Sequence, residues 1–297
     1  MFQTAEVGRS LDKEAFKKER TEVRTRLVSL QQQLRGSDRP IVVILEGLHG
    51  AGRGELANRL LEWLDPRGVE THALWDLSDE ELQRPYYWRF WRRLPARGRI
   101  GILFGGWYQE LLTRGGEGII EAHELDAELT RIRHFEEMLA ADGAVILKFW
   151  CHLPEDVQKR YLKKRDHMPG EHYRYGNGKK ACLKNRKRFL ATAEETILKT
   201  DTGDAPWYLV ECTDHRYRDL TVARTLAHGI EEALAGEDPR PVRHASGSPR
   251  LPRAESAHRT VLDQVDLDTR LPKKEYKKQL RHYRSRINEL VWEGYRQ

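Results

Sequence analysis

Residues 41–54 read Ile-Val-Val-Ile-Leu-Glu-Gly-Leu-His-Gly-Ala-Gly-Arg-Gly. The apolar run at 41–45 predicts a buried strand, and the leucine spacing at 56–64 predicts a helix after the glycines. A strand, a glycine-rich turn and a helix in this order are typical of loops whose backbone N–H groups surround phosphate oxygens. This stretch therefore predicts a phosphate-binding loop at Gly47–Gly54.

The loop keeps the G-x-x-x-x-G spacing, but two of its side chains are unusual. Arg53 stands where lysine is usual, and Gly54 stands where a Ser or Thr would hold Mg²⁺. An arginine supplies positive charge, although its planar fork does not replace a lysine freely. The glycines either bind phosphate or only preserve a tight turn between strand and helix. The residues expected to bind phosphate are Gly47, Gly50, Ala51, Gly52, Arg53 and Gly54.

Composition narrows the class of protein. The chain has 297 residues, a net charge of +6 and a pI near 9.1, which allows a polyanionic partner. The three cysteines, Cys151, Cys182 and Cys212, have neither disulfide-framework nor zinc spacing, so a reducing compartment fits best. Residues 1–10 lack an apolar core, and the apolar runs are too short to span a bilayer. We expect a cytoplasmic protein without membrane contact.

Apolar segments alternate with helical patterns along the chain. This alternation predicts an α/β fold whose parallel sheet is covered on both faces. Residues 11–34 predict an amphipathic helix ahead of the first strand. The expected strands are 41–45, 69–74, 100–104, 144–150 and 207–211, and the expected helices lie near 54–64, 78–93, 120–141, 154–165, 186–200 and 216–235.

A segment rich in Gly, Lys and Tyr, His167–Lys184, interrupts the pattern where a lid over a phosphate site would lie. Basic residues flank it. They contact a polyanion or form a solvated face, and we expect the first because of their position. The residues assigned to this lid and to polyphosphate contact are Lys163, Arg165, Lys184 and Arg188.

The end of the chain repeats its beginning. Residues 271–278 echo residues 11–18, and the match continues without a gap to Leu290. A repeat at this offset indicates one whole unit followed by the first helix of another. We therefore divide the chain into an N-terminal helix at 1–35, a P-loop domain at 36–235, a proline-rich linker at 236–260 and the start of a second repeat at 261–297. A second homologous domain is an expected partner.

Further blocks occur in a fixed order along the chain: Arg84–Trp91, Gly101–Tyr108, Phe135–Leu139, Leu147–Trp150 and Lys199–Tyr208. With the loop, they resemble family-2 polyphosphate kinases over about residues 11–235, and within that family the N-terminal unit of the two-domain polyphosphate:AMP phosphotransferases. The resemblance implies a P-loop kinase-like, three-layer fold with a parallel sheet and a helical lid. It also implies Mg²⁺-dependent phosphoryl transfer between polyphosphate and a nucleotide, AMP or ADP.

The chain departs from the family at two residues of the loop and at the end of the third strand. Family members have Asp where this chain has His49, and Lys where it has Arg53. Their Asp-Arg-Ser at the end of the third strand is here Phe104-Gly105-Gly106. Arg53 and His49 are thus degenerate catalytic positions, and no metal ligand is assigned. Mg²⁺ is expected only if the unit is active.

These departures leave two functions open. One is a catalytically impaired unit, a pseudoenzyme that serves as scaffold for an active second domain. The other is a non-catalytic sensor of polyphosphate or nucleotide. Whether the unit is itself an enzyme stays open. An oligomer of identical chains is also expected, and nucleic acid is not, because no recognised nucleic-acid module is present.

Overall fold

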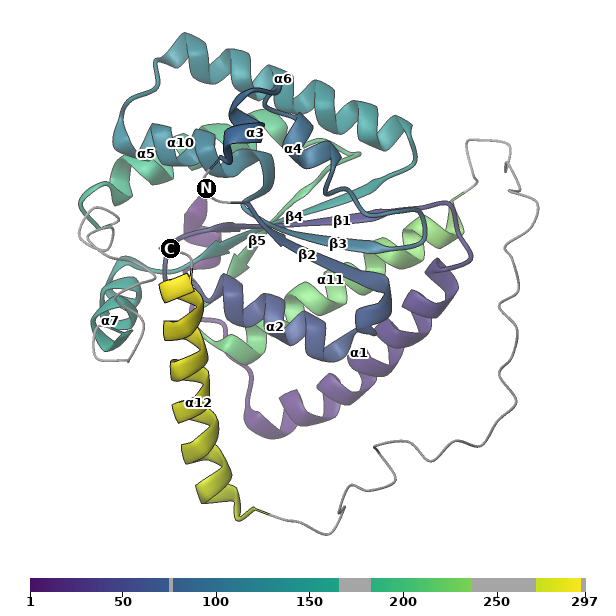
Figure 1. Ribbon diagram of the computed structural model, residues 1–297, viewed down its shortest axis with the longest axis vertical. Coiled ribbons are helices and arrows are strands. Elements are labelled where there is room, and N and C mark those ends of the chain that lie inside the picture. Colours follow the sequence, from purple (N-terminus) through teal and green to yellow (C-terminus); the bar gives the residue numbers. More distant parts are fainter. Residues whose placement is uncertain (75–76, 166–182, 237–270, 295–297) are drawn as a thin grey trace. The chain divides into compact units, whose positions relative to one another are not determined.

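A computed structural model describes residues 1–74, 77–165, 183–236 and 271–294 (Figure 1). The chain divides into two compact units, Met1–Lys163 with Gly178–Arg240, and Lys164–Asn177 with Pro241–Gln297. The first unit contains the sheet and the loop Gly47–Gly54 that is predicted to bind phosphate.

Five strands form one parallel sheet in the order β2-β3-β1-β4-β5. In β1 every residue is buried, because this central strand is covered on both faces. The carboxyl ends of parallel strands lie at one edge of the sheet, and the loop follows β1 at that edge. The strands are β1 (Ile41–Gly47), β2 (Val69–Ala73), β3 (Ile100–Phe104), β4 (Val145–His152) and β5 (Trp207–Glu211).

Helices cover both faces of this sheet (Figure 1). One layer contains α1 (Lys13–Leu34), α2 (Arg53–Trp63) and α11 (His215–Ala235). The other contains α5 (Gln109–Glu117), α6 (Ala122–Ala141) and α10 (Arg186–Thr200). Each layer buries its own apolar cluster against the sheet. The predicted three-layer α/β fold is confirmed.

One helix prediction was wrong, and one helix was not predicted. The helix expected at 78–93 is two short helices, α3 (Asp79–Leu82) and α4 (Trp88–Trp91). Pro85 separates them, since proline ends a helix at the residue before it. The sequence analysis missed α5, whose Gly115 and Gly116 weakened the helical pattern. A side chain at Gly115 would overlap Thr192 of α10, so glycine here permits close helix packing.

The remaining helices bear on the domain predictions. α7 (Glu155–Arg165) precedes the predicted lid, most of which lies outside the described residues. α12 (Lys273–Gly294) begins at the residue that the repeat pairs with Lys13, the first residue of α1. The linker is likewise outside the described residues, apart from Gly236. No helix in the described ranges is both long and apolar enough to cross a membrane.

A buried polar network joins the sheet to the helix layer that contains α6 and α10. Lys148 of β4 donates from Nζ to Glu136 Oε2 on α6, at 2.7 Å, and to the carbonyl of Thr200 on α10, at 2.7 Å. The other oxygen of Glu136 accepts from Trp107 Nε1 and Tyr108 OH, which belong to the short 3₁₀ helix η3 (Gly106–Tyr108). Partners for every charge make such burial tolerable. The network therefore fixes the chain after β3.

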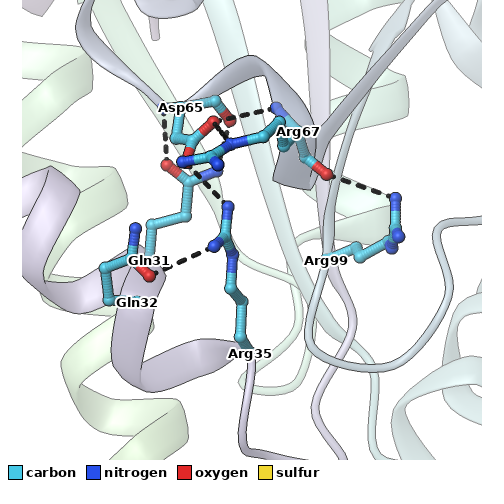
Figure 2. Close-up of polar contacts among 6 residues, drawn as sticks. All are labelled: Gln31, Gln32, Arg35, Asp65, Arg67 and Arg99. Atoms are coloured by element: carbon cyan, nitrogen blue, oxygen red, sulfur yellow. Dashed lines mark hydrogen bonds and ion pairs between the residues drawn. The ribbon is translucent and has the colours of Figure 1, made fainter. Parts of the chain in front are cut away.

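A second polar cluster organises the turn between α2 and β2 (Figure 2). Gln31 of α1 is fully buried, and its amide donates to the carbonyl of Asp65 while its oxygen accepts from the Asp65 N–H, both at 2.8 Å. The Asp65 carboxylate accepts from Arg35 and Arg67, which hold its pKa below the ordinary value. Gln31 thus replaces a backbone partner for the turn that leads through η2 (Pro66–Gly68) into β2.

The adjacent glutamines of this cluster give a matched stability test. Gln31→Ala should lower the free energy of unfolding by about 1–3 kcal/mol, because it leaves the Asp65 N–H without its partner, while the Asp65 carbonyl keeps its bond from the Gly68 N–H at 3.1 Å. Gln32→Ala is the control, since Gln32 is exposed and only accepts from Arg35 at 3.2 Å. Its effect should stay within about 0.5 kcal/mol. Denaturant unfolding measures both; equal losses would contradict the assignment.

Candidate active site

The loop is held against β4 by a close backbone contact. Leu48 N–H donates to the Cys151 carbonyl at 3.0 Å, and Gly47 has a φ of 131°. A side chain at Gly47 would overlap the Cys151 backbone, so only glycine fits this position. The sheet therefore fixes where the loop begins.

Three of the predicted phosphate-binding residues, Gly52, Arg53 and Gly54, form the amino end of α2. Gly52 is the N-cap, with φ 81° and no side-chain cap. The first N–H groups of a helix lack intrahelical partners and carry the positive end of its dipole, so they suit an anion. Arg53 and Gly54 begin this helix. Ala51 differs from the prediction, because its N–H donates to the Leu48 carbonyl at 3.1 Å within the loop.

The side chain of Arg53 is bound to Glu46, the last but one residue of β1. Arg53 Nη1 donates to Glu46 Oε2 at 3.0 Å, and the Gly47 N–H donates to the same oxygen at 3.2 Å. Glu46 is 1% exposed and Arg53 11% exposed. Within the described part of the chain, Glu46 Oε1 is buried without a hydrogen bond. When Glu46 is ionised, it neutralises the charge of Arg53 inside the protein.

Burial changes the titration of two groups at the loop. It raises the pKa of Glu46 to about 7, against the opposing attraction of Arg53. For His49, burial and then repulsion from Arg53 lower the pKa to about 4. The carbonyl of His49 accepts from Gln158 Nε2 of α7 at 2.8 Å. His49 is therefore neutral near pH 7 and does not replace the negative charge of the family's aspartate.

A buried arginine from α11 packs against the loop at Ala51 and Gly52. Arg218 is 3% exposed and pairs with Asp219 at 2.7 Å. Its Nη1 lies where a side chain at Gly52 would have to go, and it donates to the Ala51 carbonyl at 3.4 Å. The sequence analysis missed both this arginine and the role of Glu46. Glu46 could have been suspected from its place beside the loop; nothing local marks Arg218.

The end of β3 lies beside the end of β1, where the loop begins. Phe104 pairs with Leu45 in the parallel register, and Gly105 N–H donates to the Leu45 carbonyl at 3.0 Å. Mg²⁺ in phosphoryl-transfer sites is held by one or two carboxylates besides phosphates and waters. Among the described residues at the ends of β1 and β3, the carboxylate is that of Glu46. It is already paired with Arg53. No group of three metal-ligating side chains occurs within the described ranges. These residues do not fit a Mg²⁺ site.

The basic residues assigned to the lid have different surroundings. Lys163 of α7 and Lys184 are exposed. Arg188 of α10 is also exposed, and its Nη1 donates to the Glu117 carbonyl at 2.9 Å, which caps the end of α5. The side chain of Arg165 lies outside the described residues. Their contact with polyphosphate stays a prediction.

The buried state of Glu46 predicts a pH-dependent stability. Its pKa is about 7 in the folded chain and about 4.5 when unfolded, so wild-type stability falls as the pH rises between these values. Glu46→Gln removes the buried charge. The variant should match the wild type below pH 4.5 and gain up to about 3 kcal/mol above pH 7. Thermal unfolding at pH 5 and pH 8 measures the difference. A gain that is no larger at pH 8 than at pH 5 would show that burial does not raise the pKa of Glu46.

Comparison with known proteins agrees with this geometry. A model of the Polyphosphate kinase 2 (PPK2) family matches residues 10–237. A polyphosphate:AMP phosphotransferase of Pseudomonas aeruginosa is 39% identical over 98% of this chain and 58% of its own length. One of Pseudomonas syringae pv. tomato is 34% identical over 97% of this chain and 57% of its own length. The chain thus spans little more than half the length of these curated relatives.

Solved structures show the same relationship. A polyphosphate kinase 2 of Pseudomonas aeruginosa has a TM-score of 0.70 and 39% identity, covering 94% of this chain and 52% of that one. Polyphosphate Kinase 2 of Arthrobacter aurescens has a TM-score of 0.71 and 26% identity, covering 80% of this chain and 86% of that one. The loop, the sheet order and these matches agree: the chain belongs to the polyphosphate kinase 2 family.

Proposed function

We propose that this chain is the N-terminal unit of a polyphosphate:nucleotide phosphotransferase, with AMP or ADP as the nucleotide, and that this unit binds phosphate chains but transfers phosphoryl groups poorly. The names of its relatives, which include polyphosphate:AMP and AMP/ADP-polyphosphate phosphotransferases, support the substrate class. The family match supports the reaction class.

The amino end of α2 carries the binding part of the proposal. A phosphate there meets the helix N–H groups and Arg53, which stays charged at all relevant pH values. Glu46 competes for that guanidinium at 3.0 Å, so the affinity depends on how readily the pair opens. Exposed contacts from the lid would add a salt-sensitive contribution.

The replaced residues support the proposal that catalysis is impaired. Phosphoryl transfer depends on positioning and on neutralising charge around the transferred group. His49 and Phe104 stand at positions where family members have acids, and neither supplies a charged oxygen ligand. Because the described residues do not fit Mg²⁺, the reaction lacks the charge neutralisation on which the family depends. Cytoplasmic location is part of the same proposal, because the cysteine spacing fits a reducing compartment.

The helix α12 supports a second domain as partner. The repeat pairs Tyr283, Ile287 and Leu290 with apolar positions of α1 that pack against the first layer's core. On α12 these side chains are 49–60% exposed. We propose that they dock on a second domain of the same fold. The gene sequence after Gln297 tests this: a strand followed by Gly-x-x-x-x-Gly-Lys supports it, and an unrelated sequence contradicts it.

Transfer of phosphate from polyphosphate to AMP or ADP with Mg²⁺ tests the main proposal. The chain should turn over about 10²–10³-fold more slowly than the Pseudomonas aeruginosa relative assayed beside it. It should still bind polyphosphate, more weakly at higher salt. Turnover within tenfold of the relative, and abolished by Arg53→Ala, would contradict impairment.

Binding needs its own control. Arg53→Ala should weaken polyphosphate binding at low salt, whereas Arg131→Ala should not, because Arg131 is exposed on α6 away from the loop. Binding with no turnover at all would favour the sensor or scaffold alternative. Equal loss in both variants would indicate general attraction to a basic surface, and RNA should then compete as well as polyphosphate.

A further inference from the structure

Glu46 is a buried acid placed where an anion is proposed to bind. Both hydrogen bonds that it accepts from the described residues go to one oxygen, Oε2, from Arg53 and from the Gly47 N–H. Its other oxygen is buried and accepts no hydrogen bond from the described residues. A carboxylate in this setting is charged only at a cost in solvation, and a proton removes that cost.

The charge of the loop therefore depends on one proton. Arg53 keeps its charge throughout the pH range of proteins. When Glu46 is ionised, the pair is neutral; when Glu46 is protonated, the loop carries one positive charge beside the dipole of α2. An arriving anion repels ionised Glu46 and competes with it for Arg53. It thus favours the protonated form.

We propose that the loop takes up one proton with each anion it binds, and that Glu46 receives this proton. The inference rests on the anion binding proposed above and makes Glu46 a specificity-determining residue of that site. By linkage, the anion raises the affinity of Glu46 for a proton as much as the proton raises the affinity for the anion. The pKa of Glu46, about 7 without ligand, places the coupling near neutrality.

Other groups that face Glu46 do not give the same dependence. His49 in the loop has a pKa of about 4 and stays neutral. Arg53 of α2 and Arg218 of α11 stay charged. Cys151 of β4 is the remaining titratable neighbour; a hydrogen bond with Cys212 lowers its pKa. Cys151→Ser separates its contribution from that of Glu46.

Calorimetric titration with sulfate tests the coupling, because sulfate stays a dianion from pH 5.5 to 8.5. Wild-type affinity should be level at low pH and fall above pH 7, approaching about tenfold per pH unit. Titration in two buffers of different ionisation enthalpy should show up to about half a proton taken up per sulfate at pH 7, rising towards one proton at pH 8. Glu46→Gln should bind with little pH dependence and more tightly than the wild type at pH 8.

Matched variants complete the test. Glu62→Gln makes the same change on the exposed face of α2 and should behave as the wild type, as should Cys151→Ser. Wild-type binding that is level across the range, or a slope unchanged in Glu46→Gln, would overturn the proposal. Tripolyphosphate separates the two claims: if it binds in an Arg53-dependent way while sulfate binding shows no coupling, only the proton proposal fails. If neither anion binds at any pH, the proposed anion site fails and the proton proposal with it.

Discussion

The ion pair of Glu46 and Arg53 links the end of β1 to the first residue of α2. The charge of the loop between them depends on this pair. The backbone of the loop is fixed independently, by Gly47 against β4 and by Arg218 beneath Gly52. What varies is the charge presented at the helix end. Where the family resemblance implies aspartate and lysine, this loop has His49 and Arg53, and Arg53 is paired with Glu46 of β1.

Most of the residues that identify the family are not residues that would take part in phosphoryl transfer. Trp107, Tyr108, Glu136 and Lys148 come from separate blocks of the resemblance and meet in one buried network. They join β4, α6 and the chain after β3. Family membership can therefore be clear while activity is not, because function belongs to the site rather than to the fold.

Prediction from sequence succeeded where the signal is local. All five strands were located to within about two residues. Continuous apolar runs marked β1, β3 and β4, which are buried on both faces, whereas β2 is a partly exposed edge strand with polar residues. Prediction failed at α5, where Gly115 and Gly116 serve packing against α10. The loop was predictable from its glycines. The Glu46–Arg53 pair was not, because pairing depends on burial, and Arg218 reaches the loop from a helix distant in sequence.

The most direct test is a crystal structure of this chain with tripolyphosphate near pH 6, where Glu46 is protonated. The account predicts a terminal phosphate at the amino end of α2, bound by helix N–H groups and by an Arg53 that has left Glu46. Tripolyphosphate bound elsewhere, with Arg53 still on Glu46 at its present distance, would contradict the account.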